Sequence, residues 1–330
     1  MIIIILVLTF LFNTAINNRQ VLPSCTIIDY QSEEEVMTIK PLEDTNLLNT
    51  IKTKTAVAKV EIKEIDNSDK ITQNIAIDIA PSQNINYELE DYVIGVVAGE
   101  MPISFPHEAI KAQAVAARTY ALRAKINNPK IKYKDIQQAY ISIDKMKKMW
   151  GNNFEANYNK IKNAVYSTGG IILKYENEPI LAVFSSTTNG YTQECKNVWT
   201  QDLPYLSSVE SKGDELSPYY SQSITIDKHK LKKIFKSDNI KIVKTNTAGY
   251  VEEVSIGNKT YSGDQIRTML SLPSTSFEIV NNGNSITFNT KGYGHGVGMS
   301  QYGACYMANN GSNYIDILLH YYKGSIVTNI

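Results

Sequence analysis

Apolar residues recur with helical spacing just upstream of the turn at residues 101–102. Five of them fall at positions i, i+3, i+4, i+7 and i+8 of one helix face: Leu89, Tyr92, Val93, Val96 and Val97. The next position on this face, i+11, carries Glu100. The helix is predicted to end there, because Met101 precedes Pro102 and a residue before proline is disfavoured in the α conformation.

Glu100 is therefore a candidate general acid. The dipole at a helix C-terminus disfavours an anion, and apolar neighbours disfavour it further, so both effects are expected to raise the pKa of this carboxyl. A carboxyl that keeps its proton near neutral pH is what a general acid needs. The spacing indicates an acid on a buried face and leaves its substrate open.

A second helix is predicted directly after the turn. Ser104, Pro106 and Glu108 supply a cap candidate, a first-turn proline and an acid favoured by the helix dipole. The helix carries alanines at 109, 112, 114, 116, 117, 121 and 124, so neighbouring backbones can approach it closely and a central position is predicted. Arg118 lies in this stretch, where a cation needs a carboxylate or several carbonyl partners. A buried ion pair and a substrate-binding role both remain open for it.

The remaining pattern mixes helices and strands. Helices are predicted over residues 144–167, 227–235, 262–270 and 299–307, a hairpin over 171–175 and 180–185, and a strand over 249–256. These elements predict an α+β fold, with a central Ala-rich helical lobe packed against a strand-rich lobe.

Two loops carry further candidate chemistry. The hydroxyl loop (residues 185–192, SSTTNGYT) offers groups that can bond to sugar hydroxyls, although hydroxyl residues are also common turn formers. The glycine loop (residues 292–300, GYGHGVGMS) places His295 on a tight segment before a helix. His295 could therefore be a functional residue or a residue that only supports the conformation of this loop, and the sequence leaves both roles open. His295 has no second His at ligand spacing, so metal binding is not expected.

Composition and the chain start limit the remaining classes. The 330 residues contain 33 basic and 33 acidic side chains, which argues against a nucleic-acid binder that works by bulk charge. The three cysteines form no metal pair, and a Cys195–Cys305 bridge is open for an exported protein. Residues 1–20 begin with an apolar run and are predicted to be a membrane anchor or export signal. Residues 21–84 read as a stalk or linker, and residues 85–330 as the folded domain.

Four motifs then occur together in one order. They are LEDYVIGVVAGEMP with FPHEAIKAQAVAARTYA, VFSSTTNGYTQ, SGDQIRTMLSLPSTSFEI and GYGHGVGMSQYGA. In this combination the chain resembles the sporulation protein D / amidase-enhancer family from about residue 85 to its end. The resemblance implies a membrane-anchored lytic transglycosylase, with its body on the extracytoplasmic side, that cuts peptide-stripped peptidoglycan glycan strands during engulfment. It also implies two partners, the amidase stage II sporulation protein P and the membrane protein stage II sporulation protein M.

The family's essential glutamate lies in the GE-M-P segment, which assigns the catalytic role to Glu100. Hydrolases usually need two carboxylates, whereas a lytic transglycosylase can manage with one. The two loops are expected to converge on Glu100 and to line a glycan groove. Six residues are predicted to contact the glycan: Arg118, Ser186, Thr187, Tyr191, His295 and Gln301.

Two other functions stay in view. A binding module of the amidase-enhancer type would hold glycan or stimulate a partner amidase without cutting. A zinc-dependent hydrolase would need a ligand cluster, and residues 133–140 (YKDIQQAY), where some relatives bind zinc through Cys and His, contain neither residue type. No metal and no other cofactor are therefore predicted.

Overall fold

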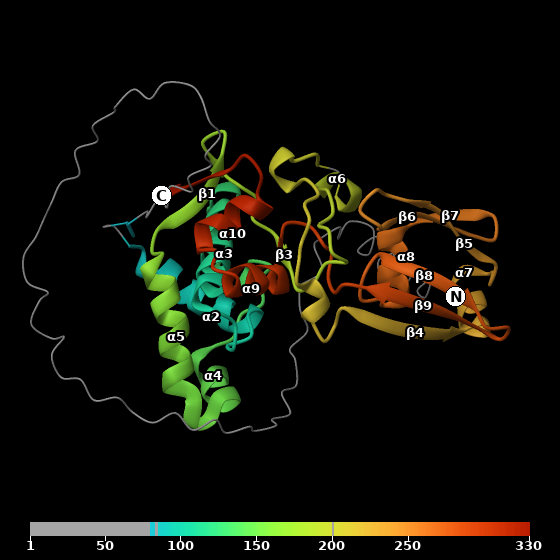
Figure 1. The fold of residues 1–330 in the computed structure, drawn as a ribbon, viewed down its shortest axis with the longest axis horizontal. Coiled ribbons are helices and arrows are strands. Elements are labelled where there is room, and N and C mark those ends of the chain that lie inside the picture. Colours follow the sequence, from blue (N-terminus) through green and yellow to red (C-terminus); the bar gives the residue numbers. More distant parts are fainter. Residues whose placement is uncertain (1–79, 83–84, 200) are drawn as a thin grey trace, which may run out of the picture. The chain divides into compact units, whose positions relative to one another are not determined.

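The computed structural model describes residues 80–82, 85–199 and 201–330 (Figure 1). Helices and antiparallel sheets are both present, which confirms the predicted α+β class. The predicted anchor (residues 1–20) and most of the predicted linker (residues 21–84) lie outside the described residues. In the part that is described, no helix combines the length and apolar character needed to cross a membrane.

The first two helices follow the sequence pattern closely. Helix α2 (Tyr87–Glu100) starts at Asn86, whose side chain caps the helix, and ends at Glu100 because Met101 is extended. Helix α3 (His107–Asn127) has Pro106 as its N-cap residue, so Ser104 does not cap it. Glu108 lies in the first turn of α3, where the dipole favours an acid.

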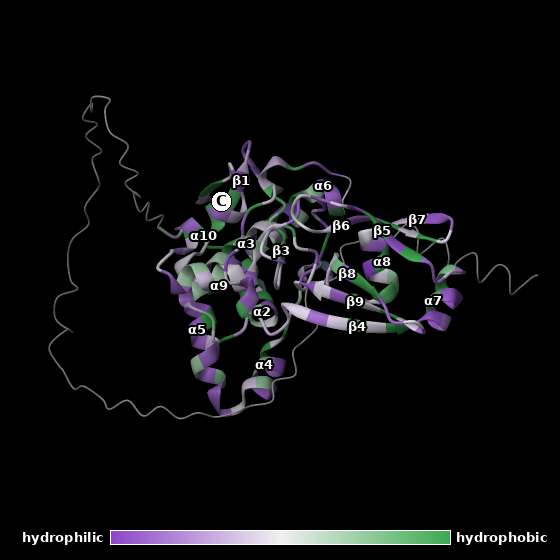
Figure 2. Ribbon diagram, turned by 45° about the vertical axis from the view of Figure 1, so that its right-hand side comes forward, coloured by the Kyte–Doolittle hydropathy of each residue, from purple (hydrophilic) through white to green (hydrophobic). Residues whose placement is uncertain are grey.

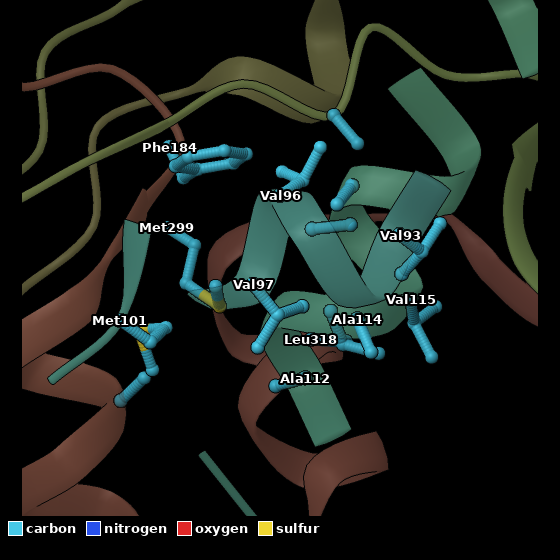
Figure 3. Packing of buried hydrophobic residues seen from close by; sticks show 14 of the residues in the cluster. Val93, Val96, Val97, Met101, Ala112, Ala114, Val115, Phe184, Met299 and Leu318 are labelled. Atoms are coloured by element: carbon cyan, nitrogen blue, oxygen red, sulfur yellow. The ribbon is translucent and has the colours of Figure 1, made fainter. Parts of the chain in front are cut away.

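Helix α3 is central, as its alanines predicted. Helices α2, α5 (Phe154–Ser167), α9 (Gln301–Asn309) and α10 (Tyr314–Tyr321) and strand β1 (Ile171–Tyr175) all contact it. Figure 3 shows the shared core, in which residues of α2 and α3 pack with Phe184, Met299 and Leu318. Six of the seven alanines of α3 are buried, Ala124 being the exception, and their small side chains leave room for these neighbours.

The helical stretch predicted over residues 144–167 is divided. Helix α4 (Ile143–Trp150), the 3₁₀ turn η2 (Gly151–Asn153) and α5 follow one another. Gly151 has φ of +48°, a left-handed conformation that favours glycine and ends α4. A short 3₁₀ turn, η1 (Tyr133–Asp135), precedes α4.

The predicted hairpin is correct for its first strand, β1, and for its turn, but not for its second strand. Strand β1 pairs with β2 (Glu178–Pro179) for two residue pairs and with β11 (Ile326–Asn329) on its other side. Strand β3 (Phe184–Ser185) then pairs in parallel with β10 (Met299–Ser300). The predicted second hairpin strand thus leaves β1 to join a distant part of the chain. The helix predicted over 299–307 begins at Gln301 instead.

Two three-stranded antiparallel sheets make up the strand-rich part. One has the order β4 (Ser221–Asp227), β9 (Ser285–Lys291), β8 (Ser276–Asn281), and the other β5 (Ile240–Thr245), β6 (Val251–Ile256), β7 (Lys259–Ser262). Helices α7 (Lys228–Phe235) and α8 (Gly263–Leu270) cover a second hydrophobic cluster, and the outward face of α7 is hydrophilic (Figure 2). Short helical turns complete the chain: α6 (Cys195–Val198), η3 (Pro204–Leu206) and η4 (Asp214–Leu216).

Candidate functional site

Glu100 occupies the last position of α2 and is 5% exposed. Its Oε1 accepts a hydrogen bond of 2.9 Å from the backbone N–H of Ala139. The turn that follows is fixed by Lys160 of α5, whose Nζ donates to the carbonyls of Ile103 and Phe105 at 2.6 and 2.8 Å. The carboxyl therefore lies on a supported helix end with a backbone donor against it.

The donor belongs to a segment that we call the strap (residues 136–141), which crosses the C-terminal half of α2. The Ile141 N–H donates to the Gly95 carbonyl at 3.1 Å. A Cβ on Gly95 would lie 2.1 Å from the Tyr140 ring, and one on Gly99 would lie 3.2 Å from the Ala139 carbonyl. The strap was not predicted as part of the site. The pair of glycines four residues apart on a buried helix was the signal for it.

Tyr92 ties the strap to the same helix. Its hydroxyl donates to Gln138 Oε1 at 3.1 Å, and its ring stacks on Tyr133 and Tyr140 with centroid distances of 4.8 and 5.8 Å. Burial raises the pKa of Tyr92, and the neighbouring Tyr120 and Glu100 raise it further, in that order. Tyr92 thus keeps its proton and stays a hydrogen-bond donor.

The hydroxyl loop and the glycine loop are joined to each other. Thr187 and Tyr293 exchange two backbone hydrogen bonds of 3.1 and 2.8 Å, and Gln193 N–H donates to the Gly296 carbonyl at 2.7 Å. The β3–β10 pair that flanks the loops packs in the core beside the end of α2, where Phe184 and Met299 lie near Met101 (Figure 3). That the loops line a groove with Glu100 stays a prediction.

Arg118 has a structural role in the fold. Its side chain is fully buried, and two of its nitrogens bind Glu90 at 2.8 and 2.6 Å, while the carbonyls of Val165 and Ile171 each accept at 3.0 Å. Of the two roles left open for Arg118, the buried pair is the one present, and a guanidinium closed off in this way has no face for a glycan. The expected contact between Arg118 and the glycan stays a prediction, and the buried pairing argues for the structural role instead.

Comparison with known proteins identifies the family. The chain is 45% identical over 253 residues to Stage II sporulation protein D of Bacillus amyloliquefaciens, covering 72% of this chain and 74% of that protein. It is 43% identical over 257 residues to the protein of the same name from Bacillus subtilis (strain 168), covering 74% and 75%. The chain belongs to the stage II sporulation protein D family. The family model described as SpoIID, stage II sporulation protein, matches residues 82–175, which include α2, α3 and the strap.

This sporulation family also has a more distant relative with a different name. The chain is 29% identical over 297 residues to a Bacillus subtilis (strain 168) protein named Amidase enhancer, covering 71% of this chain and 40% of that protein. The expected resemblance to the sporulation protein D / amidase-enhancer family is thus confirmed.

His295 of this stage II sporulation protein D family member is buried beside Trp199, with ring centroids 5.1 Å apart. Its Nδ1 accepts from the Val297 N–H at 3.0 Å, and burial, with Arg267 as a second cause, lowers the pKa of His295 to about 3. The imidazole is therefore neutral at physiological pH. This geometry favours support of the loop conformation over proton transfer for His295.

The other predicted contacts differ in exposure. Ser186 and Thr187 are buried and share a hydroxyl hydrogen bond of 3.2 Å. Gln301 is buried and donates to Gln113 of α3 at 3.4 Å, which links the start of α9 to the central helix. Tyr191 is 49% exposed. It is the member of this set with a side chain open to a ligand.

Asp214 was missed by the sequence analysis. It is fully buried and accepts hydrogen bonds from the hydroxyls of Thr188, in the hydroxyl loop, and Ser300, in the glycine loop. Burial raises the pKa of Asp214 to about 6, although hydroxyl donors partly oppose the rise. The carboxyl therefore connects the two loops. It lies in a KGDEL segment whose local pattern is that of an ordinary polar turn.

The described residues contain no group of three or more His, Cys, Asp or Glu that could hold a metal ion. Cys195 and Cys305 are both free thiols, so the disulfide that was left open for them is not formed. The absence of a metal role stays a prediction for this chain.

Proposed function

We propose that the chain is a lytic transglycosylase that cuts peptidoglycan glycan strands, with Glu100 as general acid and general base. The supporting observation is the setting of Glu100, a carboxyl at the end of a buried helix with one oxygen bound by a backbone N–H. Among the described residues, the other buried carboxyls are Glu90 and Asp214, and both have no exposed surface. Glu100 retains a small exposed fraction, through which a glycosidic oxygen can approach.

In this mechanism, Glu100 donates its proton to the glycosidic oxygen as the bond to C1 of the N-acetylmuramyl unit breaks. The carboxylate then takes the proton of the C6 hydroxyl on the same sugar. The C6 oxygen bonds to C1 and closes a 1,6-anhydro ring, so Glu100 regains its proton and no water is consumed. The substrate's acetamido group stabilises the cationic intermediate, so one protein carboxyl suffices.

The loops complete the proposal. Tyr191 offers an exposed aromatic face on which a sugar ring can pack. Ser186, Thr187, His295 and Gln301 are buried, and they support glycan binding by holding the hydroxyl and glycine loops in place. Asp214 serves the same end through its hydroxyl contacts to both loops.

The cellular setting is proposed from the family. The chain would act on denuded glycan during engulfment, together with the amidase stage II sporulation protein P and the membrane protein stage II sporulation protein M. A single anchor in residues 1–20 would hold the body on the extracytoplasmic side of the membrane.

The test uses Glu100→Gln and peptide-free glycan strands. We expect the wild-type protein to release fragments with 1,6-anhydro-muramyl ends, and Glu100→Gln to lower the rate by about 10²-fold or more. Glu88→Gln, an exposed position on the same helix, is the matched control and should keep the wild-type rate. Products are identified by mass spectrometry. Equal rates for wild type and Glu100→Gln would remove Glu100 from the mechanism.

The similarity to the protein named Amidase enhancer supports a second candidate, a glycan-binding module that stimulates an amidase without cutting. This candidate predicts no anhydro products from the wild type and equal stimulation of a sporulation amidase by wild type and Glu100→Gln. Measuring amidase turnover on intact peptidoglycan with both proteins separates it from the transglycosylase.

A further inference from the structure

We infer that the strap orients the catalytic carboxyl, and that Tyr92 and Gln138 are positioning residues that act on Glu100 through it. This inference rests on the proposed function, since it assigns a role in the chemistry of Glu100. Neither Tyr92 nor Gln138 needs to touch the glycan for this role.

The first step concerns the two oxygens of Glu100. The Ala139 N–H lies 2.9 Å from Oε1, and a backbone N–H can only donate. Oε1 therefore accepts whether the carboxyl is charged or neutral, and the acidic proton resides on Oε2. The strap in this way selects Oε2, which is buried in this structure, as the atom that gives a proton to the glycosidic oxygen and later takes one from the C6 hydroxyl once the glycan is bound against it.

The second step concerns how the strap keeps its distance from α2. It lies directly on Gly95 and Gly99, where any side chain would push into Tyr140 or the Ala139 carbonyl. The Ile141–Gly95 backbone hydrogen bond holds one end of the strap. The strap can therefore approach α2 only because these helix positions have no side chain.

The third step concerns the other end of the strap. Tyr92 is two turns before Glu100 on α2, and its hydroxyl binds Gln138, the residue before Ala139. The Tyr92 ring lies between Tyr133 and Tyr140, and the Lys125 ammonium lies 4.6 Å from the Tyr133 ring centroid. Two hydrogen bonds therefore connect the strap to α2 at this end: Tyr92 to Gln138, and the Ala139 N–H to Glu100. Removing the first bond frees the strap at the residue next to the Ala139 donor.

The kinetic test uses Tyr92→Phe, Gln138→Leu and the double variant, with peptide-free glycan as substrate. We expect kcat to fall about 10-fold while KM stays within about twofold, because a shifted carboxyl weakens proton transfer more than binding. The double variant should lose no more than either single variant, since all three lack the same hydrogen bond.

Tyr166→Phe is the matched control. This tyrosine also lies against α2, but toward its start, with its hydroxyl 3.5 Å from Asp91 and its ring centroid 6.3 Å from that of Tyr87. Wild-type kcat is expected for it. Wild-type kcat in folded Tyr92→Phe and Gln138→Leu would overturn the positioning role, and so would an equal loss in Tyr166→Phe.

A second readout requires no activity. The ¹⁵N–¹H resonance of Ala139 should move with pH as Glu100 titrates, and this movement should vanish in Glu100→Gln and shrink in Tyr92→Phe. If the wild type shows the titration but cuts no glycan, the proposed function fails and the orientation of Glu100 by the strap stands. If Ala139 does not respond to Glu100, the inference fails even in an active enzyme.

Discussion

Three buried carboxyls show how surroundings set the use of one chemical group. Glu90 is neutralised by Arg118, Asp214 is surrounded by hydroxyl donors, and Glu100 meets a backbone N–H at a helix end. A buried charge that lacks a partner is costly, so the first two arrangements stabilise structure. Only the third keeps exposed surface, which is why a catalytic role is proposed for Glu100.

The pH dependence of stability should reveal Asp214. Its pKa is about 6 in the folded chain against 3.8 as the ordinary value, so the folded state binds a proton more readily than the unfolded state between these values. The stabilisation is complete only well below pH 3.8 and is lost as pH rises through 6. Relative to Asp214→Asn, the wild type should therefore lose about 2 kcal/mol of unfolding free energy between pH 4 and 7.

Urea unfolding of both proteins at several pH values measures this difference, and the subtraction removes the contribution of other titrating groups. Parallel stability curves for wild type and Asp214→Asn would contradict the raised pKa.

At this residue scale, the sequence predicted the burial of Glu100 from helical periodicity. It also predicted that Arg118 needs a carboxylate or carbonyl partners. It could not name Glu90 as that partner, because the pairing depends on how α2 packs on α3. Nor could it find Ala139, because a backbone N–H donor leaves no mark in residue type.

At the scale of elements, local signals located most of the helices, although they merged α4 with α5 and missed α10. Asn86, Asp227 and Ser262 cap α2, α7 and α8, and the ends of these helices follow the apolar spacing. The strands were harder to predict, since β3 and β10 contribute two residues each and pair across more than a hundred positions of the chain. The sequences of β3 (Phe184–Ser185) and β10 (Met299–Ser300) contain no local signal that each has a parallel partner strand.

Gly298 of the glycine loop packs against the backbone of Val183, just before β3, and this contact leads to a stability prediction. Gly298 has φ of +74°, and a Cβ there would lie 2.0 Å from the Val183 carbonyl. Gly298→Ala should therefore cost more than the roughly 1 kcal/mol expected from the left-handed backbone alone. Gly283→Ala is the control, because Gly283 has φ of +81° and no atom within 4 Å of its Cβ position.

Chemical denaturation of the two alanine variants compares their free energies of unfolding. We expect Gly298→Ala to be less stable than Gly283→Ala by about 2 kcal/mol or more, since a backbone carbonyl must move. Equal losses would show that the β3–β10 junction is not closely packed.

At the scale of the whole molecule, the described residues contain two hydrophobic clusters with separate elements. One gathers the helices around α3 with β1, and the other lies among β4–β9, α7 and α8. The sequence prediction treated residues 85–330 as one domain, because apolar spacing shows that a segment is buried but not which core receives it. Ser221 pairs with Lys291, so the first and last residues of the segment 221–291 lie side by side on neighbouring strands.

This pairing leads to the prediction that residues 221–291 fold when expressed alone. The segment keeps both three-stranded sheets, helices α7 and α8 and its own buried cluster, and its ends are already paired. The isolated segment loses contacts such as the hydrogen bond from the Tyr250 hydroxyl to the Tyr191 carbonyl, each worth about 1 kcal/mol. We expect native-like circular dichroism and one cooperative urea transition.

Phe288→Ala in the same segment is the control, because Phe288 is fully buried in the cluster and its loss costs about 3–5 kcal/mol, near the total stability of so small a unit. That variant should be unfolded. If the unmodified segment shows no cooperative transition, its core depends on the helices around α3, and the two clusters fold as one unit.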